Sequence, residues 1–259
     1  MRRGPILAVL AVFALGVAAG GAAAQIATGA HADHPVLSAT YAEPTAVYDH
    51  AILGDALEWS ALDLTIGPCS ACDPATPPLS LRMTLPAGRV FEDIAPRIVD
   101  ADGDGRAEVL VVETDLALGA RLALYDNVAT PLAATPFIGQ THRWLAPVGQ
   151  GVGDLDGDGR PEIAYVDRPH LDRVLRVWRL EGGALVEVAA LAGVTNHRIG
   201  EDVITGGIRS CGTGDEAIVV SADWTRIVAV RLEGGTLVPR DIGAFDGSRS
   251  VDAAMACRS

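Results

Sequence analysis

An internal repeat is the feature that most restricts the fold of this chain. The segment from Asp100 to Glu108 shares the pattern Asp-x-Asp-Gly-Asp-Gly-Arg-x-Glu with the segment from Asp154 to Glu162, at an offset of 54 residues. The same step from Glu162 reaches Glu216, and each of the three glutamates precedes a short apolar run. A repeat of this length indicates successive similar units that bury their apolar faces against one another.

The apolar runs are short and come in pairs, which is typical of strands joined by tight turns. In the last two units, Gly182-Gly183 and Gly234-Gly235 separate apolar segments, and glycine accepts the positive φ of hairpin turns. No segment beyond the first residues has a sustained helical period, so we expect no helix there. The sequence predicts an all-β fold, either a β-propeller or a related radial β-repeat of about four blade-like units. A β-sandwich is the alternative. The expected units are residues 48–88, 89–142, 143–196 and 197–257.

The N-terminus has the pattern of a secretory signal. Two arginines precede an apolar run, and Ala22-Ala23-Ala24 before Gln25 is typical of a cleavage site. We therefore expect residues 1–24 to be a signal peptide and residues 25–259 to form a single β-repeat domain in the periplasm or outside the cell. No cysteine follows the apolar run to carry a lipid, so no membrane anchor is expected.

The charge of the chain restricts its partners. The formal net charge is -13, and removing the two arginines of the signal makes it -15. Nucleic acids and anionic membranes are poor partners for such a chain.

Export would place the four cysteines in an oxidising environment, where an even number usually forms disulfides. We expect Cys69 to pair with Cys72, and Cys211 with Cys257, so that the second bridge ties the chain end to the last unit. A thioredoxin-like redox pair should lie between a strand and a helix, whereas Cys69 and Cys72 precede a proline-rich stretch. A four-cysteine zinc site would need a second pair with ligand spacing.

The Asp-rich loops have the oxygen ligands that a hard cation prefers. Aspartates at the first, third and fifth positions place carboxylates inside a tight turn. The backbone carbonyl of the seventh residue is a further ligand, and the glutamate at the ninth position completes the coordination shell of the ion. Calcium fits best, because magnesium prefers a stricter octahedron and zinc prefers nitrogen or sulfur. The predicted ligands of two calcium sites are Asp100, Asp102, Asp104, Arg106 and Glu108 in the first loop, and Asp154, Asp156, Asp158, Arg160 and Glu162 in the second.

The same loops begin like an EF-hand but do not continue like one. An EF-hand loop needs a glutamate at its twelfth position and a helix after it, whereas the residues there are Val111 and Tyr165 in predicted strands. A metal-free Asp-Gly turn is the other interpretation, and two matched copies argue against it.

These two motifs, each opening a strand, resemble FG-GAP or VCBS repeats. The resemblance implies calcium in a loop between two strands of a blade, as in integrin-type propellers, and covers residues 90–235 at best. The glutamate at the ninth position departs from the aspartate common in that family. In the third unit the ligand positions become Ile208, Ser210 and Gly212, so we expect no metal there, and a disulfide from Cys211 would take its place.

Two consecutive units are entered by aligned polar pairs, His142-Arg143 and His197-Arg198. In a propeller, such segments lie near one mouth of the central channel, so these four residues are a candidate ligand site for an anion. Asp115, Asp167, His170 and Asp223 are further candidates. The interpretation that we favour is that the pairs are hydrogen-bonded junctions between units.

No G-x-S-x-G, H-E-x-x-H or phosphate-binding glycine loop is present in the sequence. We therefore predict a non-enzymatic, exported, calcium-binding scaffold or binding module whose partner is another protein or a glycan. The alternative is an extracytoplasmic hydrolase or lyase with its polar site at the channel mouth.

Overall fold

The computed structural model describes residues 33–54, 57–212 and 214–258, and the predicted signal peptide lies outside them. Strands make up most of the regular structure, which confirms the prediction of an all-β fold. In this part of the chain, no helix is long and apolar enough to cross a membrane.

Three consecutive units of antiparallel strands follow one another along the chain, and the strands of the first unit belong to an eight-stranded sheet. The first contains β4 (Arg89–Phe91), β5 (Arg97–Val99), β6 (Glu108–Asp115), β7 (Gly119–Tyr125) and β8 (Pro131–Ala134). The second contains β9 (Leu145–Gly153), β10 (Glu162–Asp167), β11 (Val174–Glu181) and β12 (Ala184–Ala192). The third contains β13 (Val194–Thr195), β14 (Gly207–Ser210), β15 (Asp215–Ser221), β16 (Arg226–Glu233) and β17 (Thr236–Ala244). The predicted repetition of blade-like units is thus confirmed.

The chain before these units forms β1 (Val36–Thr45), β2 (Glu58–Ile66) and β3 (Leu79–Thr84). β2 pairs with both β1 and β3, and it joins the first repeat sheet through the pair Trp59 and Phe91. The predicted first unit therefore shares one sheet with its neighbour, and β1 lies before the boundary expected for that unit.

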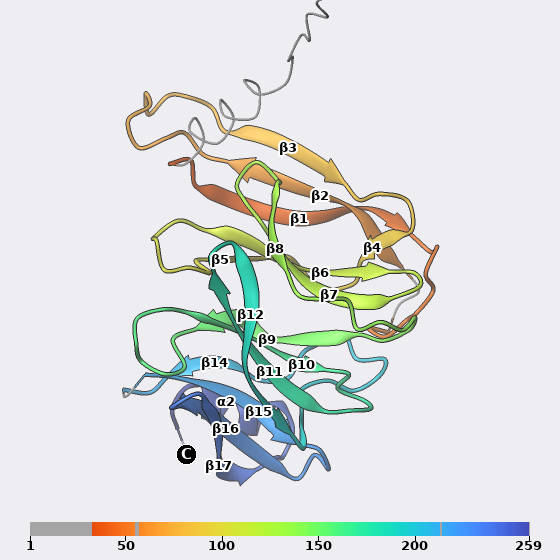
Figure 1. Cartoon of the computed structure of the whole chain (residues 1–259), viewed down its shortest axis with the longest axis vertical. Helices are drawn as coiled ribbons and strands as arrows, with labels where there is room; N and C mark the ends of the chain where they lie inside the picture. The colour runs from red at the N-terminus through yellow and green to blue at the C-terminus, as the bar shows by residue number, and fades with distance from the viewer. Residues whose placement is uncertain (1–32, 55–56, 213, 259) are drawn as a thin grey trace, which may run out of the picture. The chain divides into compact units, whose positions relative to one another are not determined.

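The sheets stack face to face because the middle strands are apolar on both sides. In β6, Val109 and Val111 pack with β2, whereas Leu110 and Val112 pack with β9 and β10. β10 repeats this alternation: Ile163 faces the first repeat sheet, and Ala164 faces the third. Figure 1 shows the resulting succession, from β1 to β3 at one end to β15 to β17 at the other.

The outer face of the third repeat sheet is covered by a helix, α2 (Ser248–Met255). Its Val251 and Ala254 pack on Ile218, Ile227 and Ala229 of β15 and β16. The prediction of no helix after the signal is therefore wrong for this segment. Two helical turns are too short to produce a recognisable period, and the helix is stabilised by burial against the sheet. It occupies the face on which a further sheet would pack.

Both predicted disulfides are present. Cys69–Cys72 closes a turn between β2 and β3, and Cys211–Cys257 joins the loop between β14 and β15 to the residues after α2. The second bridge therefore fastens the terminal helix to the last unit.

The two bridges should differ in their effect on stability, because they join cysteines 46 and 3 residues apart. A longer loop restricts the unfolded chain more, so we expect Cys211→Ser with Cys257→Ser to lower the free energy of unfolding by about 4 kcal/mol. The matched control, Cys69→Ser with Cys72→Ser, should lower it by about 2 kcal/mol. Urea unfolding followed by tryptophan fluorescence measures both, and a larger loss in the control would contradict the expectation.

Candidate functional site

The two Asp-rich loops have the same backbone geometry. Asp100 accepts hydrogen bonds from the N–H groups of Gly103 at 2.7 Å and Gly105 at 2.9 Å. Asp154 accepts the corresponding bonds from Gly157 at 2.8 Å and Gly159 at 3.1 Å. These four glycines have φ between 77° and 85°, a conformation that other residues rarely adopt. The first aspartate thus folds each loop around its own carboxylate.

Three side chains of each loop bring carboxylate oxygens close together. The ligand atoms of Asp100, Asp102 and Glu108 all lie within 4.8 Å of one another, and the same holds for Asp154, Asp156 and Glu162. Oxygen atoms at this spacing can share one cation.

The fifth-position aspartates lie outside these groups. The carboxylate of Asp104 pairs with the guanidinium of Arg106, and Asp158 pairs with Arg160 at 3.1 Å. Arg106 and Arg160 also donate their backbone N–H groups to these same aspartates, at 2.8 Å in both loops. An ion that took Asp104 or Asp158 as a ligand would have to displace an exposed arginine side chain.

The glutamates are buried at the first residue of β6 and of β10. Glu108 accepts the N–H of Ala101 at 2.8 Å, and Glu162 accepts that of Leu155 at the same distance. In each case Oε2 takes the backbone bond, so Oε1 remains for another partner. Burial, together with the charges of the surrounding aspartates, raises the pKa of Glu108 to about 7.

The second loop differs from the first in the partner of the Oε1 atom of its glutamate. Arg179 of β11 lies opposite Glu162 and donates to its Oε1 from Nε at 2.8 Å. The same guanidinium donates to Asp156 at 2.9 Å. Burial raises the pKa of Glu162, and Arg179 opposes this effect. Among the residues that the structure describes, no ion pair joins Asp100, Asp102 or Glu108 to an arginine of another strand.

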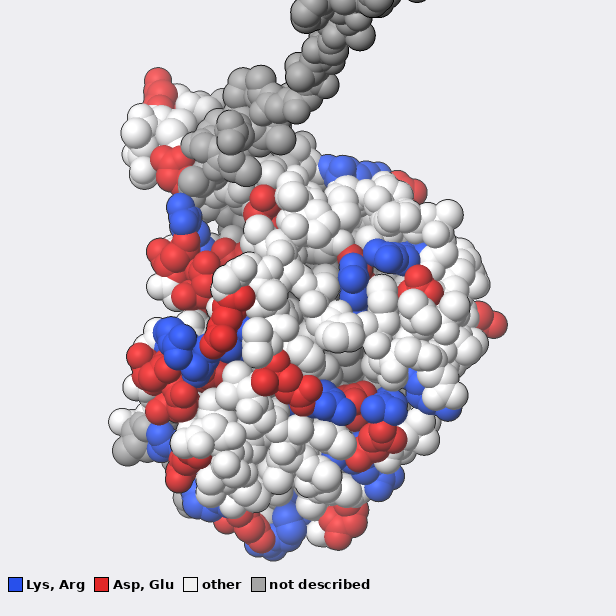
Figure 2. Space-filling view, viewed as in Figure 1, with Lys and Arg blue, Asp and Glu red and all other residues white. Residues whose placement is uncertain are grey.

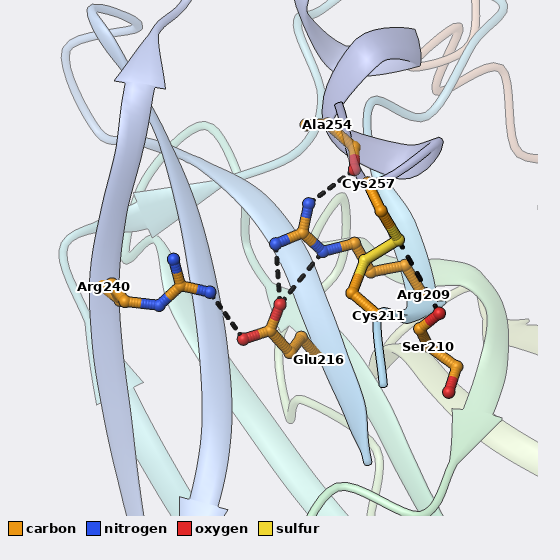
Figure 3. Close-up of a disulfide and its surroundings, with 7 residues drawn as sticks. All are labelled: Arg209, Ser210, Cys211, Glu216, Arg240, Ala254 and Cys257. Atoms are coloured by element: carbon orange, nitrogen blue, oxygen red, sulfur yellow. Dashed lines mark hydrogen bonds and ion pairs between the residues drawn. A yellow bond between two sulfur atoms is a disulfide. The ribbon is translucent and has the colours of Figure 1, made fainter. Parts of the chain in front are cut away.

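The third unit keeps its glutamate and replaces the loop. Ile208 and Ser210, which the alignment places at ligand positions, lie in β14, because the segment before Glu216 forms a tight hairpin. Arg209 donates to Oε2 of Glu216 at 2.7 and 3.0 Å, and Arg240 donates to Oε1 at 2.7 Å. Figure 3 shows both guanidinium groups on this carboxylate, beside the Cys211–Cys257 bridge.

The predicted ligand residues His142 and His197 lie at two ends of one chain of contacts. The ring of His142 stacks on Tyr48, with centroids 4.9 Å apart, and lies 5.2 Å from the ring of His50. His50 pairs with Glu92 at 2.5 Å, and the backbone carbonyl of Glu92 accepts the indole N–H of Trp144.

At the other end of this chain, the ring of Trp144 lies edge-on to His197, at 4.8 Å between centroids. The imidazole of His197 hydrogen-bonds to His170 at 2.9 Å. Burial lowers the pKa of His170 to about 4, so its ring is uncharged at neutral pH. This group of aromatic and ionisable side chains is the histidine cluster: Tyr48, His50, Glu92, His142, Trp144, His170 and His197.

The side chains of the other predicted members make no contact with the side chains of the cluster among the interactions of the described residues. Arg143 donates to the carbonyl of His142, and Arg198 lies over the ring of Trp224 at 4.1 Å. Asp167 pairs with two arginines, Asp115 faces Arg89 at 3.7 Å, and Asp223 accepts hydrogen bonds within its own turn. The sequence analysis missed Tyr48, His50 and Glu92 because they lie outside the segments that the repeat aligns.

Comparison with protein families agrees with the loop geometry. Residues 100–165 match the family model of an FG-GAP-like repeat. The predicted resemblance is confirmed for this segment, which contains both Asp-rich loops and reaches into β10. No curated protein matches the chain.

Solved structures with partial similarity to the chain include two lyases. The exotype rhamnogalacturonan lyase YesX has a TM-score of 0.43 and 15% sequence identity, over 81% of this chain and 48% of that one. The rhamnogalacturonan lyase YesW has a TM-score of 0.39 and 15% identity, over 83% of this chain and 52% of that one. The chain thus spans about half the length of each.

The pair of guanidinium groups on Glu216 gives a test of the unit that follows the FG-GAP-like repeat. Glu216→Ala would leave the buried Arg209 without a counterion, so we expect the free energy of unfolding to fall by about 4 kcal/mol. Arg240→Ala removes a side chain that is 60% exposed and should cost less than about 1 kcal/mol. Denaturant unfolding of both variants measures the two losses of unfolding free energy. Equal losses would contradict the expectation that Glu216 stabilises the unit mainly as the counterion of the buried Arg209.

Proposed function

We propose that the protein is an exported, non-enzymatic scaffold or binding module that two calcium ions stabilise, with another protein or a glycan as its partner. The observation that carries this proposal is the pair of matched oxygen groups, Asp100, Asp102 and Glu108 in one loop and Asp154, Asp156 and Glu162 in the other. In each group the glutamate keeps one oxygen that no backbone group takes.

The residues of the loops fit calcium. The close ligand atoms are all carboxylate oxygens, which calcium prefers to nitrogen or sulfur. The ions would be held by these three side chains together with Asp104 or Asp158 and the carbonyl of Arg106 or Arg160. A bound divalent cation would neutralise the repulsion among the carboxylates and fasten each loop to the strand that follows it.

Two further observations support the remaining parts of the proposal. The two disulfides indicate an oxidising, extracytoplasmic environment, which agrees with export to the periplasm or beyond. Figure 2 shows acidic side chains, with arginine side chains among them, along one edge of the described surface, on the side where Figure 1 places the loops before β6 and β10. The formal net charge of -13 would repel nucleic acid and anionic lipid.

The surroundings of the predicted ligand residues favour binding over catalysis. Within the described part of the chain, the ring of Trp144 and the residues around Glu92 connect His142 to His197, and no direct contact joins the two rings. Arg143 and Arg198 engage other partners. Groups that cooperate in acid and base catalysis must reach one substrate from hydrogen-bond distance.

Calcium should raise the thermal stability of the purified protein. At a free concentration about one hundred times the Kd, each site adds about 2.7 kcal/mol, and each kcal/mol raises the midpoint of a domain of this size by about 3 °C. Melting curves in calcium and in EDTA measure the difference. The double variant Asp100→Asn with Asp154→Asn is the control and should lose the response. An unchanged midpoint for the natural protein in the two conditions would remove the metal from the proposal.

The two sites should also differ in affinity. Arg179 occupies Oε1 of Glu162 and a carboxylate oxygen of Asp156, so calcium must displace it from the second loop. We expect two binding steps in a calorimetric calcium titration, with Kd values at least about tenfold apart, equivalent to about 1.4 kcal/mol. Asp100→Asn should abolish the tighter step, and Asp154→Asn the weaker one.

The variant Arg179→Met tests whether the two Kd values differ because Arg179 competes with calcium or because the two loops differ in shape. Because the variant removes the competing cation and keeps an apolar stem, it should bring the weaker Kd toward the tighter one. Arg176→Met, on the same strand and paired with Asp167, is the matched control and should leave both steps unchanged. A second loop that binds as weakly in Arg179→Met as in the natural protein would show that Arg179 does not compete with the ion.

A further inference from the structure

The Cys69–Cys72 bridge lies beside a third side chain of the kind that binds metals. One ring nitrogen of His34 and the sulfur atoms of both cysteines all lie within 4.8 Å of one another. His34 precedes β1, whereas the cysteines lie in the loop between β2 and β3, so the fold brings them together. Two sulfurs and one imidazole nitrogen are ligands that zinc prefers. A reduced bridge would therefore offer a zinc ion three ligands, in a place distinct from the Asp-rich loops.

Hydrogen bonds hold His34 in this position. Its Nδ1 lies 2.8 Å from the carbonyl oxygen of Gly67, two residues before Cys69. The N–H of Gly67 donates to the carbonyl of Pro35 at 2.8 Å, and the side chain of Asn127 donates to the carbonyl of His34 at 2.7 Å. A carbonyl group beside the ring of a metal-binding histidine commonly fixes the orientation of that ring. The imidazole is thus oriented by groups that are not themselves ligands.

The bridge is open to chemical attack and contributes little to the fold. Cys69 and Cys72 are both partly exposed, and Ser70 and Ala71 between them are exposed. A disulfide is reduced when a thiolate reaches one of its sulfurs, so an accessible bridge can exchange with another thiol. The two cysteines are only three positions apart, and a bridge that closes so short a loop restricts the unfolded chain little. Its reduction should therefore leave the fold intact.

We infer that Cys69, Cys72 and His34 form a zinc site that reduction of the bridge opens. A dithiol exchanges with the bridge: the bond between the two sulfurs breaks, a disulfide forms in the dithiol, and the dithiol's two electrons and two protons convert the cysteines into thiols. The two thiols then release their protons as zinc binds both sulfurs and the imidazole. Water takes the fourth position of the tetrahedral ion, because the chain supplies three ligands.

The chain contains internal controls for this site. The close ligand atoms of the Asp-rich loops are carboxylate oxygens, which favour calcium over zinc. Cys211 and Cys257 form the second bridge, and among the described residues neither belongs to a group of three potential metal ligands. A response that requires sulfur, and that is confined to one cysteine pair, therefore reports this site alone.

Cobalt(II) is the probe for the direct test, because it accepts the same ligands as zinc and its bonds to thiolate absorb in the near ultraviolet. The calcium-loaded protein is reduced with tris(2-carboxyethyl)phosphine and titrated with cobalt(II) in the absence of oxygen. We expect one equivalent to bind with thiolate-to-cobalt absorption, and zinc to displace it. The unreduced protein should not develop this absorption. Its absence from the reduced protein would overturn the inference.

Three variants locate the absorption. Cys69→Ser with Cys72→Ser keeps the second cysteine pair and should show no thiolate-to-cobalt absorption after reduction. His34→Ala removes the third ligand, so we expect its affinity for cobalt to fall at least about tenfold, equivalent to about 1.4 kcal/mol. His142→Ala, which removes an exposed histidine elsewhere, is the matched control and should bind cobalt like the natural protein. Undiminished absorption in the double variant, or unchanged affinity in His34→Ala, would also overturn the inference.

A measurement on the natural protein covers the case in which a variant does not fold. The protein is equilibrated in a series of glutathione redox buffers with and without zinc, its thiols are trapped with N-ethylmaleimide, and peptide mass spectrometry identifies them. Because zinc binds only the reduced form, it should shift the equilibrium at Cys69 and Cys72 toward thiols at least about tenfold. The equilibrium of Cys211 and Cys257 should not move. An equilibrium at the first pair that zinc leaves unchanged would contradict the inference.

The zinc site and the calcium proposal can fail separately. The double variant Cys69→Ser with Cys72→Ser keeps both Asp-rich loops, so its melting midpoint should still depend on calcium. The double variant Asp100→Asn with Asp154→Asn keeps the cysteines and His34, so after reduction it should still bind cobalt through sulfur. Loss of the sulfur-dependent absorption in this second variant would overturn the inference that the zinc site is distinct from the Asp-rich loops.

Discussion

The structure depends on one buried glutamate in each repeated unit, placed where the loop ends and the middle strand begins. Glu108, Glu162 and Glu216 are all less than a tenth exposed. In the first two units, one carboxylate oxygen holds the backbone N–H of the loop's second residue, which fixes the direction in which the chain enters the strand. Burial has removed the water around a carboxylate in this position, so positive charge beside it is needed to keep it ionised at neutral pH. The three units differ mainly in how they supply that charge.

The residue opposite the glutamate on the preceding strand illustrates the difference. It is Val99 in the first unit, Gly153 in the second and Arg209 in the third. Only the third unit therefore places a cation on that side, and Arg240 of β17 adds a second. The second unit receives Arg179 from the strand on the other side. The first has neither, so its glutamate depends most on the proposed ion. Since all three units preserve the carboxylate while its partner changes, charge compensation is the common constraint, and the calcium proposed for the first two loops would be one way to meet it.

Much of the fold follows from residues close together in sequence. Gly182-Gly183 and Gly234-Gly235 all have positive φ and join paired strands, as the hairpin interpretation required. The hydrogen bonds through which Asp100, Asp154 and the two glutamates accept loop N–H groups are equally local, because they join residues no more than seven positions apart. The histidine cluster is different: Tyr48 reaches His142 across 94 positions, and His50 reaches Glu92 across 42. A single sequence contains no signal for such pairs when one partner lies outside the repeat. The sequence alignment also placed the third loop wrongly. It assumed a constant step of 54 residues, whereas the hairpin before Glu216 is shorter than the Asp-rich loops of the other two units.

The end of the stack explains why the third unit differs. The first and second repeat sheets each have sheets on both faces, whereas the third has α2 on its outer face. A single helix covers less of a sheet than another sheet would, so it needs additional attachments. Arg209 provides one by donating to the carbonyl of Ala254 at 2.5 Å while its other nitrogens hold Glu216, and Cys211–Cys257 provides another within the same hairpin. An Asp-rich loop at this position would offer neither the arginine nor the cysteine. The absence of the predicted metal ligands from the third unit is therefore a consequence of its position: the segment that corresponds to an Asp-rich loop in the other two units is used here to attach the helix that ends the stack.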